Sequence, residues 1–277
     1  MSSRGVRGAL SAALIALACL LVPFGASAAW AAYGLADTDR YVTALAPLAA
    51  DPAVQDSVAD AVEDEVGEPA RPLIRSLTRT RAFATAWNAG NRAVHQAVLK
   101  ALREGGHHEV TVDIAPIAAR VEHRAVLPRT EVAVLPASEL DRLRKGYDVL
   151  EVAGFWLPVS AAALAVAGIA VAACRRRALT ATALGTALGG ALLALAVAVG
   201  RRLTLTDLPD PVRRPAAGAV YDALTGTLRT VSWLLVAVGL AVAVTCWLTG
   251  RYGVPRDRRG SAGPVPDPAQ QPTRARA

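Results

Sequence analysis

Charged and apolar residues are segregated along this chain over whole segments rather than single helical turns. Four stretches carry no charged residue: Ala9–Ala32, Val152–Cys174, Ala178–Gly200 and Val231–Gly250. Each has the ~20 residues that a helix needs to cross a hydrocarbon core about 30 Å thick. A core helix of a soluble protein keeps a polar stripe, and these stretches show none. The pattern predicts a mainly α-helical membrane protein with four transmembrane helices.

The first apolar stretch has two interpretations. Arg4 and Arg7 precede it, and Ala26-Ser27-Ala28 has the small-residue form of a signal-peptidase site, which is typical of a cleaved signal peptide. The alternative is a retained anchor. We favour the anchor because the apolar run exceeds the roughly 7–15 residues of a signal-peptide core. In both cases the chain that follows lies outside the cytoplasm.

Residues 33–151 are the one polar segment long enough to form a domain, and we expect a mostly helical extracytoplasmic domain there. Asp37 or Thr38 can cap a first helix, because a side-chain oxygen at that position accepts a free backbone amide. Pro47 should end this helix. Two more helices are expected in residues 71–81 and 83–104.

The helix after Pro47 has the clearest start signal in the domain. Asp51 is a favourable cap, and Pro52 follows at the first helical position, where a missing N–H costs nothing. Four-residue spacing predicts an inward-facing stripe made of Val54, Val58, Val62 and Val66.

The texture of the domain changes after the double glycine at residues 105–106. Segments 109–114 and 130–135 alternate and are β-branched, which predicts two strands, with a helix between them at 115–127. We expect a small two-stranded sheet, most simply parallel. A helix beginning near Ala137 should continue directly into the second span.

A second outer segment, residues 201–230, is predicted to form an amphipathic helix that continues into the fourth span. Asp210 and Pro211 repeat the cap-and-proline start. An apolar stripe follows, made of Val212, Ala216, Val220, Leu224 and Leu228. This stripe needs cover, and the outer domain is the expected partner.

Basic residues set the expected orientation. They gather in residues 1–8, in a turn at 175–177 and in a disordered tail at 251–277, where eleven Lys or Arg face two acidic residues. Short basic segments stay in the cytoplasm, so both termini are predicted there, in the cell membrane. Tryptophan positions agree: Trp30, Trp156 and Trp233 fall near the outer interface and Trp247 near the inner one. The net charge of +7 therefore indicates a lipid bilayer as partner and no nucleic acid.

Candidate chemistry is sparse. Trp87, Asn91 and His95 share one face of a predicted helix, which indicates polar groups that fix packing or, alternatively, a ligand cleft. The other histidines, His107, His108 and His123, match no zinc spacing. The sequence also has no nucleophile or phosphate-loop motif. We therefore predict no catalytic residue, no cofactor and no metal site, and a protein that is not an enzyme.

The spans carry no ionisable residue in their interiors, which argues against a self-sufficient ion-coupled transporter. Gly185 and Gly189 permit close helix contact, and Gly168 and Ala172 should let the second and third spans pack as a tight hairpin. Three hypotheses follow: a domain presented for partner or ligand binding or envelope structure, an accessory subunit of a transport or export complex, and, least favoured, an envelope enzyme using His95. We also consider a homo-oligomer.

Three segments of the chain together suggest a known group: "DTDRYVTALAPLAADPAVQDSVADAV", "FATAWNAGNRAVHQAVLKAL" and a three-span end with "RRRAL" between two spans. This arrangement resembles a group of actinobacterial four-span integral membrane proteins of unassigned function. The resemblance covers most of the chain, and its first motif is the most specific. It implies a multi-pass protein with an extracytoplasmic domain and carries over no functional residue.

Overall fold

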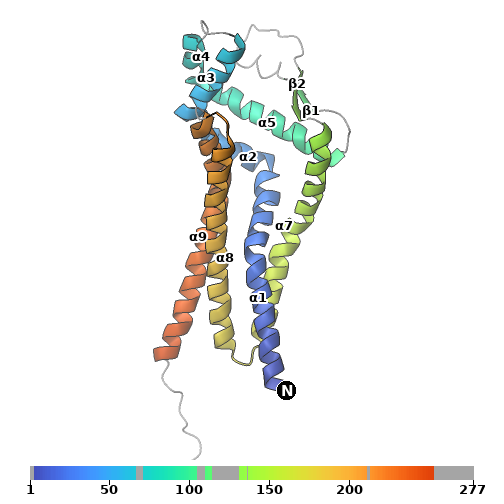
Figure 1. The fold of residues 1–277 in the computed structure, drawn as a ribbon, viewed down its shortest axis with the longest axis vertical. Helices are drawn as coiled ribbons and strands as arrows, with labels where there is room; N and C mark the ends of the chain where they lie inside the picture. Colours follow the sequence, from blue (N-terminus) through green and yellow to red (C-terminus); the bar gives the residue numbers. More distant parts are fainter. Residues whose placement is uncertain are drawn as a thin grey trace, which may run out of the picture.

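Four long helices form a bundle, and a smaller group of helices and two strands sits at one end of it (Figure 1). The structure is a computed structural model that describes residues 3–66, 71–104, 110–113, 131–135, 137–210 and 213–252. We call the smaller group, made of residues 38–104 with the two strands, the head. The far end of the bundle carries the N-terminal end of the first helix and the C-terminal end of the last (Figure 1).

The bundle helices are α1 (Ser3–Trp30), α7 (Ala137–Val171), α8 (Arg175–Asp207) and α9 (Arg214–Tyr252). All four are long and apolar enough to cross a membrane, which confirms a mainly α-helical membrane protein. At 1.5 Å per residue, α7 and α9 are about 50–60 Å long and exceed a ~30 Å hydrocarbon core. Both helices are therefore longer than one span, and their head-side parts contact the head, α7 through α5 and α9 through α2 and α3.

Two predicted boundaries at the far end of the bundle are wrong. The turn between α7 and α8 is Ala172–Cys174, and the arginines at 175–177 form the first turn of α8. Arginine is a good helix former, so three in a row extend a helix rather than break it. For the same reason α9 continues through Arg251, although the basic tail was expected to start there. The rest of that tail lies outside the described residues.

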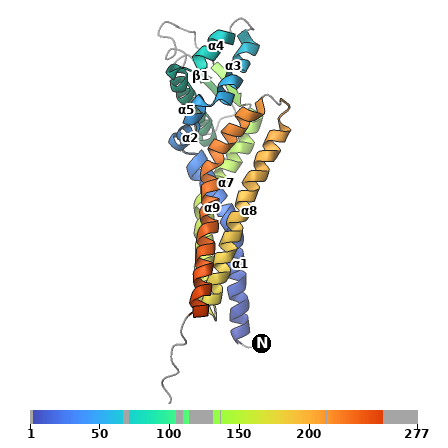
Figure 2. The ribbon, with the colours of Figure 1, turned by 90° about the vertical axis from the view of Figure 1, so that its left-hand side faces the viewer.

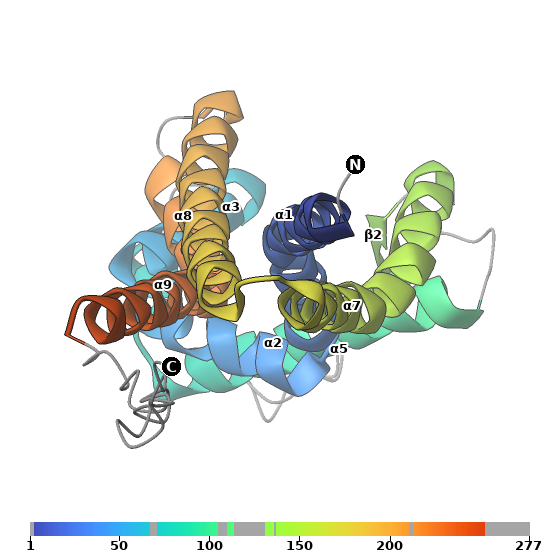
Figure 3. The same cartoon turned by 90° about the horizontal axis from the view of Figure 1, so that it is seen from below.

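The bundle consists of two closely packed pairs, α1 with α7 and α8 with α9, joined mainly by contacts of α1 with α8 (Figures 2 and 3). Small residues make these contacts close. The Ser11 hydroxyl donates to the carbonyl oxygen of Gly168 (2.7 Å), and Gly168 lies against Ile15. The predicted tight hairpin of α7 with α8 is therefore wrong, because Gly168 faces α1.

The other predicted glycines also pack within the chain. Gly185 lies against Cys19, and Gly189 lies against Pro23, so both join α8 to α1. A helix at the centre of a bundle needs small neighbours on several sides. That helix is α1, which contacts α7, α8 and α9.

A short π-helix, η1 (Ala31–Leu35), continues α1 and leads into the head. The chain continues with α2 (Thr38–Leu45), the 3₁₀ turn η2 (Ala46–Ala50), α3 (Pro52–Val66), α4 (Arg71–Thr78) and α5 (Arg81–Glu104). The predicted caps are confirmed: the Asp37 carboxylate accepts from the amide of Arg40 (2.9 Å), and the Asp51 carboxylate accepts from that of Ala53 (2.9 Å).

The valine stripe of α3 faces inward over only part of its length. Val54 is 3% exposed and Val58 packs against the core, whereas Val62 is 38% exposed. The predicted inward stripe is therefore wrong at Val62, because the surface that covers this face of α3 ends before that residue. The side chain of Val66 lies outside the described part of the head.

Two short strands follow α5 in the chain: β1 (Val110–Asp113) and β2 (Glu131–Leu135). They pair antiparallel, with Asp113 opposite Glu131 and Val112 opposite Val132. The parallel pairing expected from the sequence is wrong, and antiparallel strands need no crossover helix between them. The helix expected at 115–127 lies outside the described residues.

The head covers the middle of the predicted apolar stripe of α9, whereas Leu228 packs on Leu193 and Val197 of α8 and Val212 lies outside the described residues. Leu45, Leu48 and Val54 form a buried cluster, and a row of α9 side chains packs on it: Ala216, Ala219, Val220, Ala223 and Leu224. The helix itself is not the single 201–230 segment that was expected. Residues 201–207 complete α8, and α9 starts at Arg214.

Candidate ligand site at the junction of head and bundle

The predicted face of α5 ties the head together. The indole N–H of Trp87 donates to the carbonyl oxygen of Leu45 at the end of α2 (3.0 Å). The Asn91 amide donates to the carbonyl of Trp87 on its own helix (2.9 Å). Both side chains therefore bond to backbone carbonyls within the head. This is what we expect of side chains that fix helix packing rather than line a ligand cleft.

His95 has both ring nitrogens engaged at the other end of α2. Nε2 lies 2.8 Å from the carbonyl oxygen of Leu35, and Nδ1 lies 3.0 Å from the Thr38 hydroxyl. A carbonyl oxygen only accepts, so Nε2 carries the proton in this bond. The ring also stacks on Tyr41 at a centroid distance of 4.2 Å. With both nitrogens occupied, His95 is placed to hold α5 against α2 rather than to bind a metal.

Burial around this contact raises the pKa of the Tyr41 hydroxyl, because desolvation disfavours the phenolate. Within the described residues there is no group of three His, Cys, Asp or Glu side chains able to hold a metal ion. His107, His108 and His123 lie outside the described residues.

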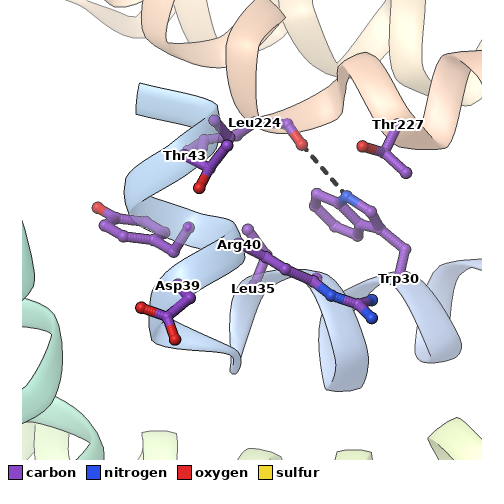
Figure 4. Close-up of a pocket in the computed structure, with 10 residues that line it drawn as sticks. Trp30, Leu35, Asp39, Arg40, Thr43, Leu224 and Thr227 are labelled. Atoms are coloured by element: carbon purple, nitrogen blue, oxygen red, sulfur yellow. Dashed lines mark hydrogen bonds between the residues drawn. The ribbon is translucent and has the colours of Figure 1, made fainter. Parts of the chain in front are cut away.

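The structure instead shows a cavity of about 400 Å³ where α1, α2 and α9 meet. Its apolar wall comes from Trp30, Leu35 and Leu224, and Figure 4 shows how these side chains lie. The polar wall comes from α2 and α9: Asp39, Arg40, Thr43 and Thr227. We call this space the junction cavity.

A hydrogen bond across the bundle fixes one wall of the junction cavity. The Trp30 indole N–H donates to the carbonyl oxygen of Leu224 on α9 (3.2 Å; Figure 4). The π-helical turn η1 follows Trp30 directly and leads into α2. Short π-helical segments occur often at functional sites, because they redirect side chains within a helix.

Arg40 lies between the junction cavity and a second cavity of about 410 Å³. Its guanidinium donates to the carbonyl oxygen of Tyr33 (3.1 Å). The second cavity is lined by charged and phenolic groups from α5 and α7, among them Arg103 and Tyr147. The Arg103 guanidinium donates to the Tyr147 hydroxyl (3.0 Å), and this hydrogen bond raises the pKa of Arg103 above its usual value. The two cavities thus flank the η1–α2 link with basic, acidic and aromatic groups.

Sequence reasoning missed this site. Trp30 was assigned to the lipid interface on the general preference of indoles, whereas its N–H bonds within the protein. The polar positions Asp39, Arg40 and Thr43 on the short helix α2 were the available signal, but their partners Leu224 and Thr227 are far away in sequence. No protein-family model, curated protein or solved structure matches this chain.

Proposed function

We propose that this chain is a non-catalytic membrane protein whose head lies outside the cytoplasm and binds an amphiphilic envelope ligand in the junction cavity. The observation that carries the proposal is the composition of that cavity. One wall is made of indole and aliphatic side chains, and the other of a carboxylate, a guanidinium and hydroxyls. Pockets of this volume class, apolar with a few placed polar groups, are the usual form of small-molecule sites.

The depth of the cavity fits an amphiphile. Trp156 on α7 and Trp233 on α9 are 59% and 62% exposed on the bundle surface, where indoles mark a membrane interface. Thr227 lies on α9 about 9 Å nearer the head than Trp233, at 1.5 Å per residue. The Trp30 indole bonds to Leu224, one turn nearer the head than Thr227, so both Thr227 and this indole lie on the head side of Trp233, at the level of lipid headgroups.

The charges of the wall define the class of ligand. Arg40 offers planar N–H donors that suit phosphate or carboxylate oxygens. Thr43 and Thr227 offer hydroxyls that both donate and accept, which suits sugar or glycerol hydroxyls. Asp39 is already paired with Arg92, so an envelope molecule with an anionic or hydroxylated headgroup on an apolar body suits both walls.

The extracytoplasmic side is supported by charge. The arginines of the α7–α8 turn region and of the end of α9 lie at the far end of the bundle from the head (Figure 1). Basic segments of short loops stay in the cytoplasm, which leaves the head outside.

Photocrosslinking in cells tests this function. A photoreactive phenylalanine analogue replaces Thr43 in the full chain, and the matched control carries the analogue at Thr85, an exposed threonine of α5 outside the cavity lining. We expect a small-molecule adduct at position 43 and none at position 85, read from intact protein mass. No adduct at either position, or equal adducts at both, contradicts the proposal.

An accessory subunit of a transport or export complex is the second candidate. All four spans line an apolar cavity of about 330 Å³ within the bundle, from Cys19 on α1 to Leu235 on α9. Gly185 and Gly189 already pack on α1, so a partner helix would have to use other faces, such as that of Leu188, which is exposed. A protein adduct formed from the photoreactive analogue at Leu188, with none from Thr43, favours this candidate over ligand binding.

A further inference from the structure

We propose that the far end of the bundle holds a site for an anionic phospholipid, in which Arg177 and Arg251 contact the phosphate and an adjoining apolar cavity takes part of an acyl chain. This site is separate from the junction cavity, and it rests on the arginines, cavities and aromatic residue at the opposite end of the spans. It does not depend on the proposed function of the head.

Two cavities meet at Arg177. The larger, of about 490 Å³, lies between the start of α8 and the end of α9 and is lined by Arg176, Arg177, Arg251, Thr180 and Trp247 among others. The smaller, of about 400 Å³, lies between α1, the α7–α8 turn and α8. Apart from Arg177, the side chains that line it are small or apolar: Gly8, Ser11, Ala12, Ile15, Ala172, Ala173, Cys174, Ala178 and Ala181. Arg177 therefore lines both the larger, arginine-rich cavity and the smaller, apolar cavity, which we call the apolar compartment.

The arginines of the larger cavity differ in what they already bind. Arg176 is held in place, since its Nε donates to the carbonyl oxygen of Cys246 (2.9 Å). Arg251 lies over the ring of Trp247 with its guanidinium carbon 5.4 Å from the ring centroid. No carboxylate pairs with Arg177 or Arg251 within the part of the chain that the structure describes, and α8 and α9 carry no Asp or Glu near this end. Two guanidinium groups thus line a cavity to which the described residues contribute no carboxylate.

Their depth points to a lipid. Trp247 is 58% exposed on the surface of α9 and marks the interface at this end. Arg251 is about one helical turn beyond it, which places the guanidinium at the level of headgroup phosphates. Arginine presents a planar set of donors that matches phosphate oxygens, and basic pockets between spans are suited to anionic headgroups.

The apolar compartment selects a phospholipid over a free anion. A soluble phosphate would fill only the arginine-lined cavity. A phospholipid would also place methylene groups against Ile15 and the alanines, where burial of apolar surface is favourable. We therefore infer a preference for the intact lipid over its soluble headgroup.

Native mass spectrometry of the full-length protein in a neutral detergent tests the site. Phosphatidylglycerol and phosphatidylcholine with identical acyl chains are titrated separately. We expect the dissociation constant for phosphatidylglycerol to be at least tenfold lower. Arg177→Gln should remove most of that preference, whereas Arg202→Gln, an exposed arginine near the other end of the same helix, should keep it.

Three results overturn the proposal: equal binding of the two lipids, equal loss in the two variants, or binding of glycerol phosphate as tight as that of phosphatidylglycerol. Circular dichroism checks that Arg177→Gln folds. Should it not fold, Arg177→Lys serves instead, because it keeps the charge and loses the planar donors. That variant should lower the preference several-fold, and an unchanged preference in it contradicts direct contact of the guanidinium with phosphate.

Discussion

Several aromatic side chains join helices, among them Trp87, predicted on a candidate cleft face, and Trp30, predicted at the lipid interface. Trp87, Trp30 and Tyr221 each donate from a ring or hydroxyl to a backbone carbonyl of another helix: Leu45, Leu224 and Val197. Aromatic residues with a polar atom suit this role, since they bury a large apolar surface and still satisfy a carbonyl. A few hydrogen bonds between residues far apart in the sequence thus hold these helices in contact.

Trp87→Phe tests the importance of one such bond. The substitution keeps most of the ring and removes the donor to Leu45, so unfolding free energy should fall by about 1 kcal/mol. Thermal unfolding followed by circular dichroism in detergent measures the change. Trp233→Phe is the matched control, because that indole is largely exposed and should tolerate the change. Equal shifts in both variants contradict the role assigned to Trp87.

The local signals of the sequence were sufficient for the caps but not for the tertiary partners. Asp37 and Asp51 accept amides two or three residues away, so their role depends on neighbours that the sequence shows. His95 depends on Leu35 of η1 and Thr38 of α2, which lie about 60 residues earlier in the chain. The sequence left two roles open for His95, packing between helices or lining a ligand cleft. The choice depends on which groups the fold brings to its ring.

Among the elements, α1 contacts each of the other three bundle helices. Its small and apolar residues contact α7 through Gly168, α8 through Gly185 and Gly189, and α9 through the Trp30 bond. Cleavage after Ala28 would remove residues 1–28, and with them the contacts of α1 with Gly168, Gly185 and Gly189. Retention of α1 as an anchor stays a prediction, and these contacts give the physical reason to expect it.

The intact mass of the protein isolated from membranes tests retention of α1. We expect the full chain, with or without the initiator methionine, because the bundle uses α1 as its central helix. A C-terminal tag allows both forms to be recovered. An N-terminus at Ala29 contradicts this prediction and would restore the signal-peptide interpretation.

Close approach of α8 and α9 gives a second prediction at this scale. A Cβ at Gly239 would lie 2.5 Å from the carbonyl oxygen of Ala183, whereas one at Gly226 meets nothing within 4 Å. Gly239→Ala should lower the melting temperature. Gly226→Ala should leave it unchanged or raise it, since alanine favours a helix by up to about 1 kcal/mol over glycine. The reverse order in a thermal melt contradicts this packing.

The sequence located the spans because hydropathy and length are properties of one segment at a time. It did not show which span each small residue faces. Gly168 was predicted to face the next helix in the chain. It faces α1 instead, where its hydrogen-bond partner Ser11 lies 157 residues earlier. Partner choice among apolar helices depends on close packing, which hydropathy does not record.

For the whole molecule, the head connects the two helix pairs. Its α3 and η2 pack on α9, while α5 runs across to the top of α7, where the Arg144 guanidinium donates to the carbonyl of Ala101 (3.2 Å; Figure 1). A ligand in the junction cavity would touch α1, α2 and α9 together. The cavity is therefore placed where binding can stabilise the arrangement of head and bundle.

This account depends on which side of the membrane the head occupies, and cysteine labelling in intact cells measures that most directly. Cys174 is exposed in the α7–α8 turn, and Asp56 is exposed on α3 of the head. One variant keeps Cys174 alone, and the other carries Asp56→Cys in a chain whose three native cysteines are replaced by serine. With a membrane-impermeant maleimide, we predict labelling at position 56 in intact cells and labelling at Cys174 only after lysis. The opposite pattern would place the head in the cytoplasm and contradict the proposed function.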